Sequence, residues 1–128
     1  MSYRSHEHIY PLTASSYQFV GRKVAAVLFG EERVEVKTWR GVYTEVLKRC
    51  NADPRGHEGL MYLRNKAAGR VRVFLSDKPD GMRSPAKIDE DMYGETNYGS
   101  ATMMHILCNQ ILYYTGFDYS DISVALKA

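Results

Sequence analysis

The segment KVAAVLFGEERVEVKTWRGVYTEVLKRC, residues 23–50, carries the clearest structural pattern in the chain. A short apolar run, a Gly-Glu-Glu turn and an alternation of polar and apolar side chains together predict a β-hairpin with Val34 and Val36 facing inward. Thr38 then offers a hydroxyl suited to a helix N-cap, and apolar residues recur with helical spacing over 39–50. The segment therefore predicts a hairpin followed directly by an amphipathic helix.

The next part of the chain predicts a second, shorter helix and another strand. Residues 58–67 favour a helix with an apolar side, although two glycines weaken its start. Residues 70–76 then alternate, so a strand there would place Arg70, Arg72 and Phe74 together on its exposed face. Basic groups beside an exposed aromatic ring suit a phosphate backbone and unstacked bases.

The C-terminal third predicts a loop, a strand, a long helix and a final strand. Residues 77–91 hold turn-forming residues and carboxylates, which favour a loop, and residues 92–96 favour a short strand. A helix is predicted over 101–114, with Ser100 as its N-cap. The apolar stretch 122–126 reads as a last strand, either at the sheet edge or beside the first hairpin.

Apolar side chains cover almost the whole circumference of the predicted helix over 101–114. Its polar residues Thr102, His105 and Asn109 form only a narrow strip. Such a helix is buried on two sides. It is therefore either a central helix wrapped by sheet and loops, or a helix that shares its second face with another subunit.

Length and composition favour one small domain. The chain has 128 residues, 45% of them hydrophobic, and a formal net charge of +2. We expect a flexible N-terminal arm over 1–11 and a single α+β domain over 12–128. Within that domain, an antiparallel sheet of about five short strands would pack on two main helices, opening with the hairpin and then the helix. With no membrane span and no signal-peptide pattern, we expect a cytoplasmic protein that does not bind membranes.

No motif of known chemistry stands in the sequence. The glycine-rich phosphate loops and the nucleophile elbow are absent, and the histidines lack the spacing of a metal site. Both cysteines, Cys50 and Cys108, fall on apolar helical stripes, which predicts reduced core thiols rather than nucleophiles. We therefore expect no catalytic residue, no metal and no cofactor, and an enzyme is the less favoured class.

Several short motifs resemble an uncharacterised small prokaryotic domain that occurs alone or fused to restriction and phage-defence proteins. The resemblance covers about residues 24–126, and it implies an α+β domain with a nucleic-acid or defence context. The motifs that carry it are Phe29-Gly30, the strand with Val34 and Val36, Thr38-Trp39, Arg83-Ser84-Pro85, Ile88, Tyr93, Asn97 and Ser100.

The uneven distribution of charge leads to the functional hypothesis. Residues 33–72 hold most of the basic side chains, which favours a binding surface for an anionic partner. We predict a non-catalytic binding module for a phosphate-bearing partner, either nucleic acid or a nucleotide-like ligand. The predicted ligand-binding residues are Arg64, Arg70, Arg72, Arg83, Tyr93, Asn97 and Ser100. The alternative is a homo-oligomerisation or protein-interaction domain that acts as an accessory or inhibitory protein, with the two-sided helix and the tyrosines as its interface.

Overall fold

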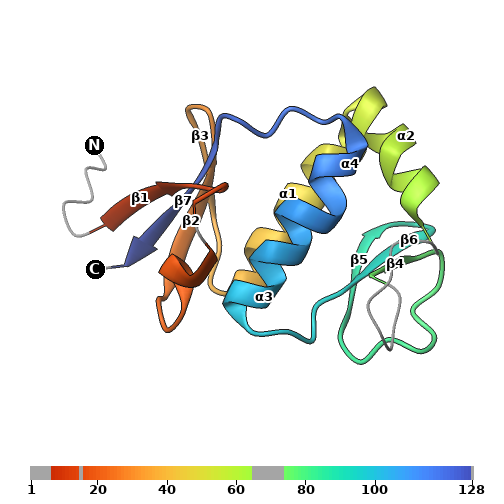
Figure 1. Ribbon diagram of the computed structural model, residues 1–128, viewed down its shortest axis with the longest axis horizontal. Coiled ribbons are helices and arrows are strands. Elements are labelled where there is room, and N and C mark those ends of the chain that lie inside the picture. Colours follow the sequence, from red (N-terminus) through yellow and green to blue (C-terminus); the bar gives the residue numbers. More distant parts are fainter. Residues whose placement is uncertain (1–6, 15, 65–73, 128) are drawn as a thin grey trace.

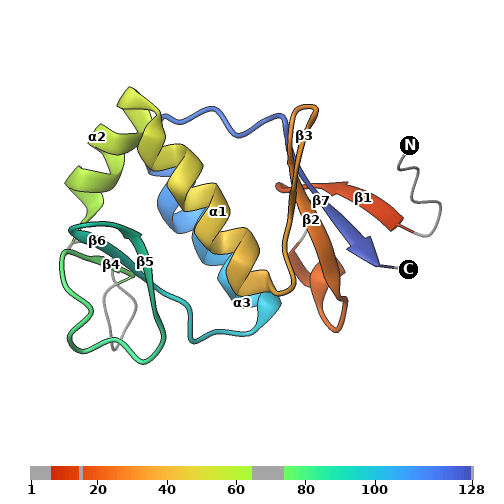
Figure 2. The same ribbon diagram turned by 180° about the vertical axis from the view of Figure 1, so that it is seen from behind.

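The computed structural model describes residues 7–14, 16–64 and 74–127, and these form an α+β fold (Figure 1). Two sheets lie on opposite sides of a layer of helices, as the view from behind also shows (Figure 2). In chain order the elements are β1 (Glu7–Pro11), η1 (Ser16–Phe19), β2 (Val24–Phe29), β3 (Glu32–Glu35), α1 (Trp39–Ala52), α2 (Pro54–Leu63), β4 (Leu75–Ser76), β5 (Pro85–Asp89), β6 (Met92–Glu95), α3 (Ser100–His105), η2 (Ile106–Leu112), α4 (Tyr113–Thr115) and β7 (Ile122–Lys127).

The larger sheet has four antiparallel strands in the order β1-β7-β2-β3. The predicted hairpin is confirmed as β2 and β3, joined at Gly30, whose positive φ of 63° suits a tight turn. The final strand β7 lies between β1 and β2. Of its two predicted positions, the one beside the first hairpin is therefore correct.

Part of the predicted N-terminal arm is a strand. Within the predicted arm of residues 1–11, Glu7–Pro11 forms β1 and pairs with β7, from Glu7 opposite Lys127 to Pro11 opposite Ser123. Arg33 of β3 donates two hydrogen bonds to the Glu7 carboxylate, at 3.0 and 2.8 Å. The strand gives little sequence signal because most of its side chains remain exposed or half-buried, so it is held by main-chain pairing.

The smaller sheet replaces part of the single five-stranded sheet that the sequence predicts. It has three strands in the order β4-β6-β5. The strand β5 lies in the stretch predicted as a loop, and its Pro85 is tolerated because it begins an edge strand. Phe74, predicted to be exposed, is buried and contacts the ring of Tyr98 with 6.4 Å between ring centroids.

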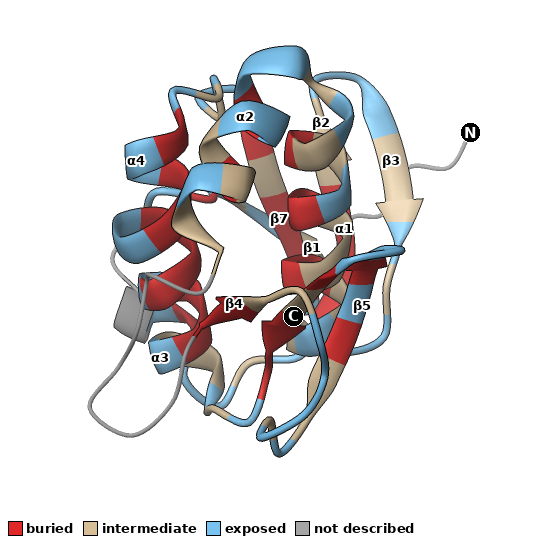
Figure 3. Cartoon of the chain, turned by 90° about the vertical axis from the view of Figure 1, so that its right-hand side faces the viewer, coloured by how far each residue is buried: buried red, intermediate tan, exposed pale blue. Residues whose placement is uncertain are grey.

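The helix α1 has the predicted start and its predicted buried face. The Thr38 hydroxyl accepts a hydrogen bond from the Gly41 amide at 3.1 Å, as an N-cap does. Its buried residues are Val42, Tyr43, Val46, Leu47 and Cys50. Figure 3 shows such buried positions gathered where the helices and the sheets face one another.

The helix α2 begins earlier than predicted because Asp53 caps it and Pro54 occupies its first turn. Its two glycines are required for close packing. A Cβ at Gly56 would lie 2.2 Å from the Cys50 carbonyl oxygen, and one at Gly59 would lie 2.5 Å from the Thr115 Cα. The end of the predicted helix and most of the predicted strand over 70–76 lie outside the described residues.

The long C-terminal helix runs continuously from Ser100 to Thr115, but its middle is a π-helix. Its N-cap is Gly99, and the Ser100 hydroxyl instead donates to the Phe19 carbonyl oxygen at 3.3 Å, so the predicted cap is wrong. Gly116 ends the helix with a positive φ of 76°. From Met103 to Leu112 its apolar side chains are buried within the chain, as expected of a central helix, whereas Tyr113 and Tyr114 at its end are exposed.

Both thiols are buried and unpaired, as predicted. Burial raises the pKa of Cys50 to about 12 and that of Cys108 to about 11, so both remain protonated at neutral pH. Within the described part of the chain, no helix combines the length and apolar character needed to cross a membrane.

Candidate ligand-binding site

Two of the predicted ligand residues, Arg83 and Asn97, meet around the buried carboxylate of Glu95. The Arg83 amide donates to Glu95 Oε1 at 2.9 Å, and the Asn97 amide donates to Oε2 at 3.0 Å. The Ser84 amide adds a third bond, to Oε2 at 2.9 Å. Glu95 is fully buried at the end of β6. Arg83 and Asn97 therefore converge on the Glu95 carboxylate through their backbone amides and not through their side chains.

This arrangement already holds an anion of the protein itself. Converging backbone N–H groups can bind a phosphate oxygen, but here they donate to the Glu95 carboxylate. A ligand would have to use the side chains of Arg83 and Asn97, which are both exposed. The sequence offers no signal for the buried carboxylate, since a lone glutamate ending a strand is usually solvated.

The other predicted residues lie elsewhere. Arg64 follows α2 and bonds Asp91 twice, to its carbonyl oxygen at 2.9 Å and to its carboxylate at 3.1 Å. Tyr93 lies half-buried on β6, opposite Lys87 of β5 in the register. Ser100 contacts the main chain of Phe19, as described above. Arg70 and Arg72 lie outside the described residues. Of the five predicted residues that the structure describes, only Arg83 and Asn97 meet at one place.

A shallow groove runs between α1 and the edge strand β5. It consists of two adjoining hollows of about 300 and 360 Å³, both lined by Lys87. Arg40 lies at one end and donates to the Pro85 carbonyl oxygen at 2.7 Å, while Lys48 lines the other hollow. We call this surface the α1–β5 groove. Its lining residues are Thr38, Arg40, Gly41, Thr44, Glu45, Lys48, Ala86, Lys87, Ile88, Asp89 and Glu90.

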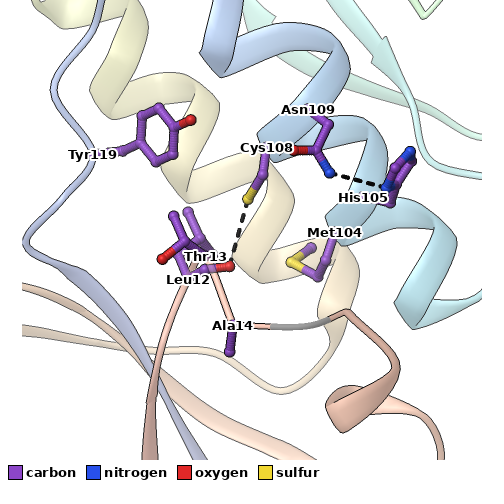
Figure 4. Close-up of a pocket in the computed structure, with 8 residues that line it drawn as sticks. All are labelled: Leu12, Thr13, Ala14, Met104, His105, Cys108, Asn109 and Tyr119. Carbon is purple, nitrogen blue, oxygen red and sulfur yellow. Dashed lines mark hydrogen bonds between the residues drawn. The ribbon is translucent and has the colours of Figure 1, made fainter.

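A more enclosed cavity of about 280 Å³ lies between the N-terminal segment and the C-terminal helix (Figure 4). Residues 12–14 form one wall, the helix forms the opposite wall, and Tyr119 closes one side. The Asn109 side-chain amide lies 2.9 Å from His105 Nδ1. We call this the π-turn cavity. It is lined by Leu12, Thr13, Ala14, Met104, His105, Cys108, Asn109 and Tyr119.

The wide turn of the helix contributes to this cavity. The residues Ile106–Leu112 form the π-helix, and the Tyr113 amide bonds the carbonyl oxygen of Cys108 five residues earlier. The Cys108 thiol donates to the Leu12 carbonyl oxygen at 3.5 Å and so links the two walls. Such wide turns inside α-helices are rare. Where they do occur, they often lie at functional sites.

The groups around the π-turn cavity suit binding better than catalysis. Its thiol and His105 line the same cavity, but the raised pKa of Cys108 keeps the thiol from acting as a thiolate nucleophile. Among the described residues, no cluster of three or more histidine, cysteine or acidic side chains has the arrangement of a metal site. The lining residues of this cavity can form hydrogen bonds and apolar contacts with a ligand.

The sequence reveals half of this site. His105 and Asn109 stand out as part of the polar strip on an apolar helix, a signal that could mark a binding face. The opposite wall, residues 12–14, lies some ninety positions earlier and has no pattern that links it to the helix.

Comparison with protein-family models, with curated proteins and with solved structures finds no match to the chain.

Proposed function

We propose that the chain is a non-catalytic binding module for a phosphate-bearing partner, and that the partner lies along the α1–β5 groove. One observation carries the proposal. Arg40 and Lys48 line the groove, and neither has a carboxylate within ion-pair distance among the described residues. Exposed cations without a carboxylate partner are available to neutralise phosphates.

The spacing of these cations favours a chain of phosphates over a single one. Arg40 and Lys48 are eight residues apart on α1, which corresponds to roughly 12 Å along the helix axis. Lys87 lines both hollows between them, and Arg83 is exposed two residues before Pro85, to which Arg40 bonds. An oligonucleotide can contact the three cations of the groove at once, whereas a nucleotide contacts one or two.

Three carboxylates, those of Glu45, Asp89 and Glu90, line the same groove and moderate its charge. Asp89 accepts a hydrogen bond from Asn51 at 2.8 Å, and its pKa is lowered mainly by a bond from the Glu90 amide, so it stays ionised. We therefore expect weak binding that depends strongly on salt. The defence context remains an expectation from the sequence resemblance.

Fluorescence anisotropy with labelled single-stranded DNA, single-stranded RNA and an ATP analogue tests the proposal. With about three phosphate contacts, we expect oligonucleotide affinity to fall roughly 20-fold between 50 and 200 mM salt. The double variant Arg40→Glu/Lys48→Glu should lose binding. The matched control Lys23→Glu/Lys127→Glu makes the same change in net charge at exposed positions on the larger sheet.

Absence of binding to all three probes at 50 mM salt would overturn the proposal, as would equal losses in the variant and its control. Binding of the ATP analogue alone would replace the nucleic acid by a nucleotide as the partner.

A homo-oligomer is the second candidate, and exposed aromatic side chains favour it. Tyr62 of α2 and Tyr113 of α4 each expose 69% of their surface, and Tyr114 exposes 63%. The two helices pack against each other where Gly59 meets Thr115. Tyrosine is enriched at interfaces between proteins. Light scattering across a dilution series tests this: a mass above 14.6 kDa that falls for Tyr113→Ser supports it, and a constant monomer mass excludes it.

A further inference from the structure

We propose that the π-turn cavity is a binding site for a small, uncharged heteroaromatic molecule about the size of a nucleobase. The site is separate from the α1–β5 groove, since none of the described residues lines both. Three properties of the cavity support the proposal: its hydrogen-bonding groups, its apolar floor and its volume, and the irregular helix turn beside it.

The polar groups of the cavity select an uncharged ligand. Thr13 and Tyr119 bring hydroxyls to its sides, while His105 and Asn109 bring ring nitrogens and an amide. Among the described residues, no lysine, arginine, aspartate or glutamate lines it. A charged ligand would lose hydration without gaining an opposite charge, so it is disfavoured. A neutral molecule with both donors and acceptors finds partners on two walls.

The floor and the volume favour a planar ring. Met104 and Cys108 place two polarisable sulfur atoms beside the apolar side chain of Leu12. Sulfur makes favourable contacts with aromatic rings. The volume of about 280 Å³ lies near the lower end of the usual range for small-molecule pockets, which suits one or two fused rings and excludes larger ligands.

The π-helix provides an observation of a different kind. Its sequence, ILCNQIL, contains neither proline nor glycine, the residues that most often interrupt a helix. The irregular turn therefore has no local sequence cause. It lies against the cavity and carries Cys108 and Asn109 to its wall. A turn that is uncommon and poorly favoured persists where the surrounding structure or a function requires it.

Ligand-observed NMR and calorimetry on the full chain test the proposal. The probes are adenine, uracil and nicotinamide, with cyclohexanol as a non-planar control and benzoate as a charged one. We expect at least one of the three planar neutral probes to bind in a saturable manner, and the two controls to bind at least tenfold more weakly.

Variants locate the binding. Asn109→Ala should weaken affinity about fivefold by removing one hydrogen-bonding group. The control Gln110→Ala changes the next residue, which is exposed and does not line the cavity. Thr13→Ala, on the opposite wall, should also weaken the affinity for the planar probes, independently of Asn109. The double variant Arg40→Glu/Lys48→Glu should bind the planar probes normally, so failure of the groove proposal leaves this one standing.

Three results would overturn the proposal. The first is no binding of any planar probe at ten millimolar, and the second is equal affinity for cyclohexanol. The third is an affinity that Asn109→Ala and Thr13→Ala leave unchanged, because binding would then take place elsewhere on the chain.

Discussion

The two sheets of this protein are stabilised in different ways. The larger sheet packs apolar side chains against the helices, with Val27, Val124 and Leu126 fully buried. The smaller sheet has strands of two to five residues and places Gly94 and the carboxylate of Glu95 at buried positions. Leu75, Ile88 and Met92 of the smaller sheet also join the apolar core, but this sheet adds hydrogen bonds to a buried carboxylate and one close contact at a glycine.

The hydrogen bonds of Glu95 are the strongest feature of the smaller sheet. Three backbone N–H groups from two loops donate to its carboxylate. Hydrogen bonds to an ionised acceptor are roughly twice as strong as neutral ones. They compensate for taking the charge out of water, and they fix both loops to the end of β6.

The largest expected effect comes from removing this carboxylate. Glu95→Ala removes a fully buried carboxylate and leaves three part-buried N–H groups without their acceptor, so we expect the free energy of unfolding to fall by about 3 kcal/mol. Urea unfolding measures the loss. Glu31→Ala, at an exposed turn of the larger sheet, is the control and should change stability by less than about 0.5 kcal/mol. A loss below 1 kcal/mol for Glu95→Ala would show that the smaller sheet does not depend on it.

Truncating a buried side chain in the larger sheet should lower the free energy of unfolding by less, but it should affect hydrogen exchange in more of the chain. Val124→Ala removes two methyl groups from a fully buried position on β7, and we expect a loss of about 2 kcal/mol. Hydrogen exchange distinguishes the two variants. Glu95→Ala should speed exchange chiefly in β4, β5 and β6, whereas Val124→Ala should lower protection throughout the chain. The same exchange pattern in both variants would contradict the contrast between the sheets.

The close contact of the smaller sheet gives the next effect. A Cβ at Gly94 would lie 2.9 Å from the Tyr43 ring, which is fully buried and cannot move away. We expect Gly94→Ala to lower the free energy of unfolding by roughly 1–2 kcal/mol. Gly99→Ala adds a Cβ with nothing within 4 Å and should cost less. Equal costs in thermal unfolding would show that Gly94 is not needed for close packing.

The smallest expected effect is an increase in stability, from a substitution at Tyr43. The Tyr43 hydroxyl is buried and finds no hydrogen-bond partner among the described residues, and burial raises its pKa. Tyr43→Phe removes this unsatisfied group and keeps the ring, so we expect stability to rise by up to about 1 kcal/mol. A destabilised variant in urea unfolding would mean that the hydroxyl has a partner in solution.

The difference between apolar burial and hydrogen bonding also explains which elements the sequence could predict. Apolar periodicity marks the hairpin, α1 and β7, because burial against helices requires it. It misses β1, whose pairing uses the main chain, and β5, which begins with a proline. The buried state of Glu95 depends on amides that lie eleven and twelve residues earlier in the chain, so no local pattern shows it.

The two proposed binding surfaces also depend on contacts between segments distant in the sequence. The basic stretch predicts available cations, and Arg40 and Lys48 are among them, but which ones share a groove depends on β5. The sequence predicts that Arg64 binds a ligand because basic residues follow it, but Arg64 forms an ion pair with Asp91. The π-turn cavity needs two segments distant in the sequence, of which only the helix is recognisable beforehand.

The place of β7 in the larger sheet also affects how the sheet folds. This strand is the last of the described elements in chain order, yet it lies between β1 and β2, two of the first. Until β7 has paired, β1 and β2 both have an unpaired edge on the side where β7 inserts. Pairings of such large sequence separation form slowly. We therefore expect the larger sheet to close late in folding, with the exposed edges of β1 and β2 as the main risk of aggregation until then.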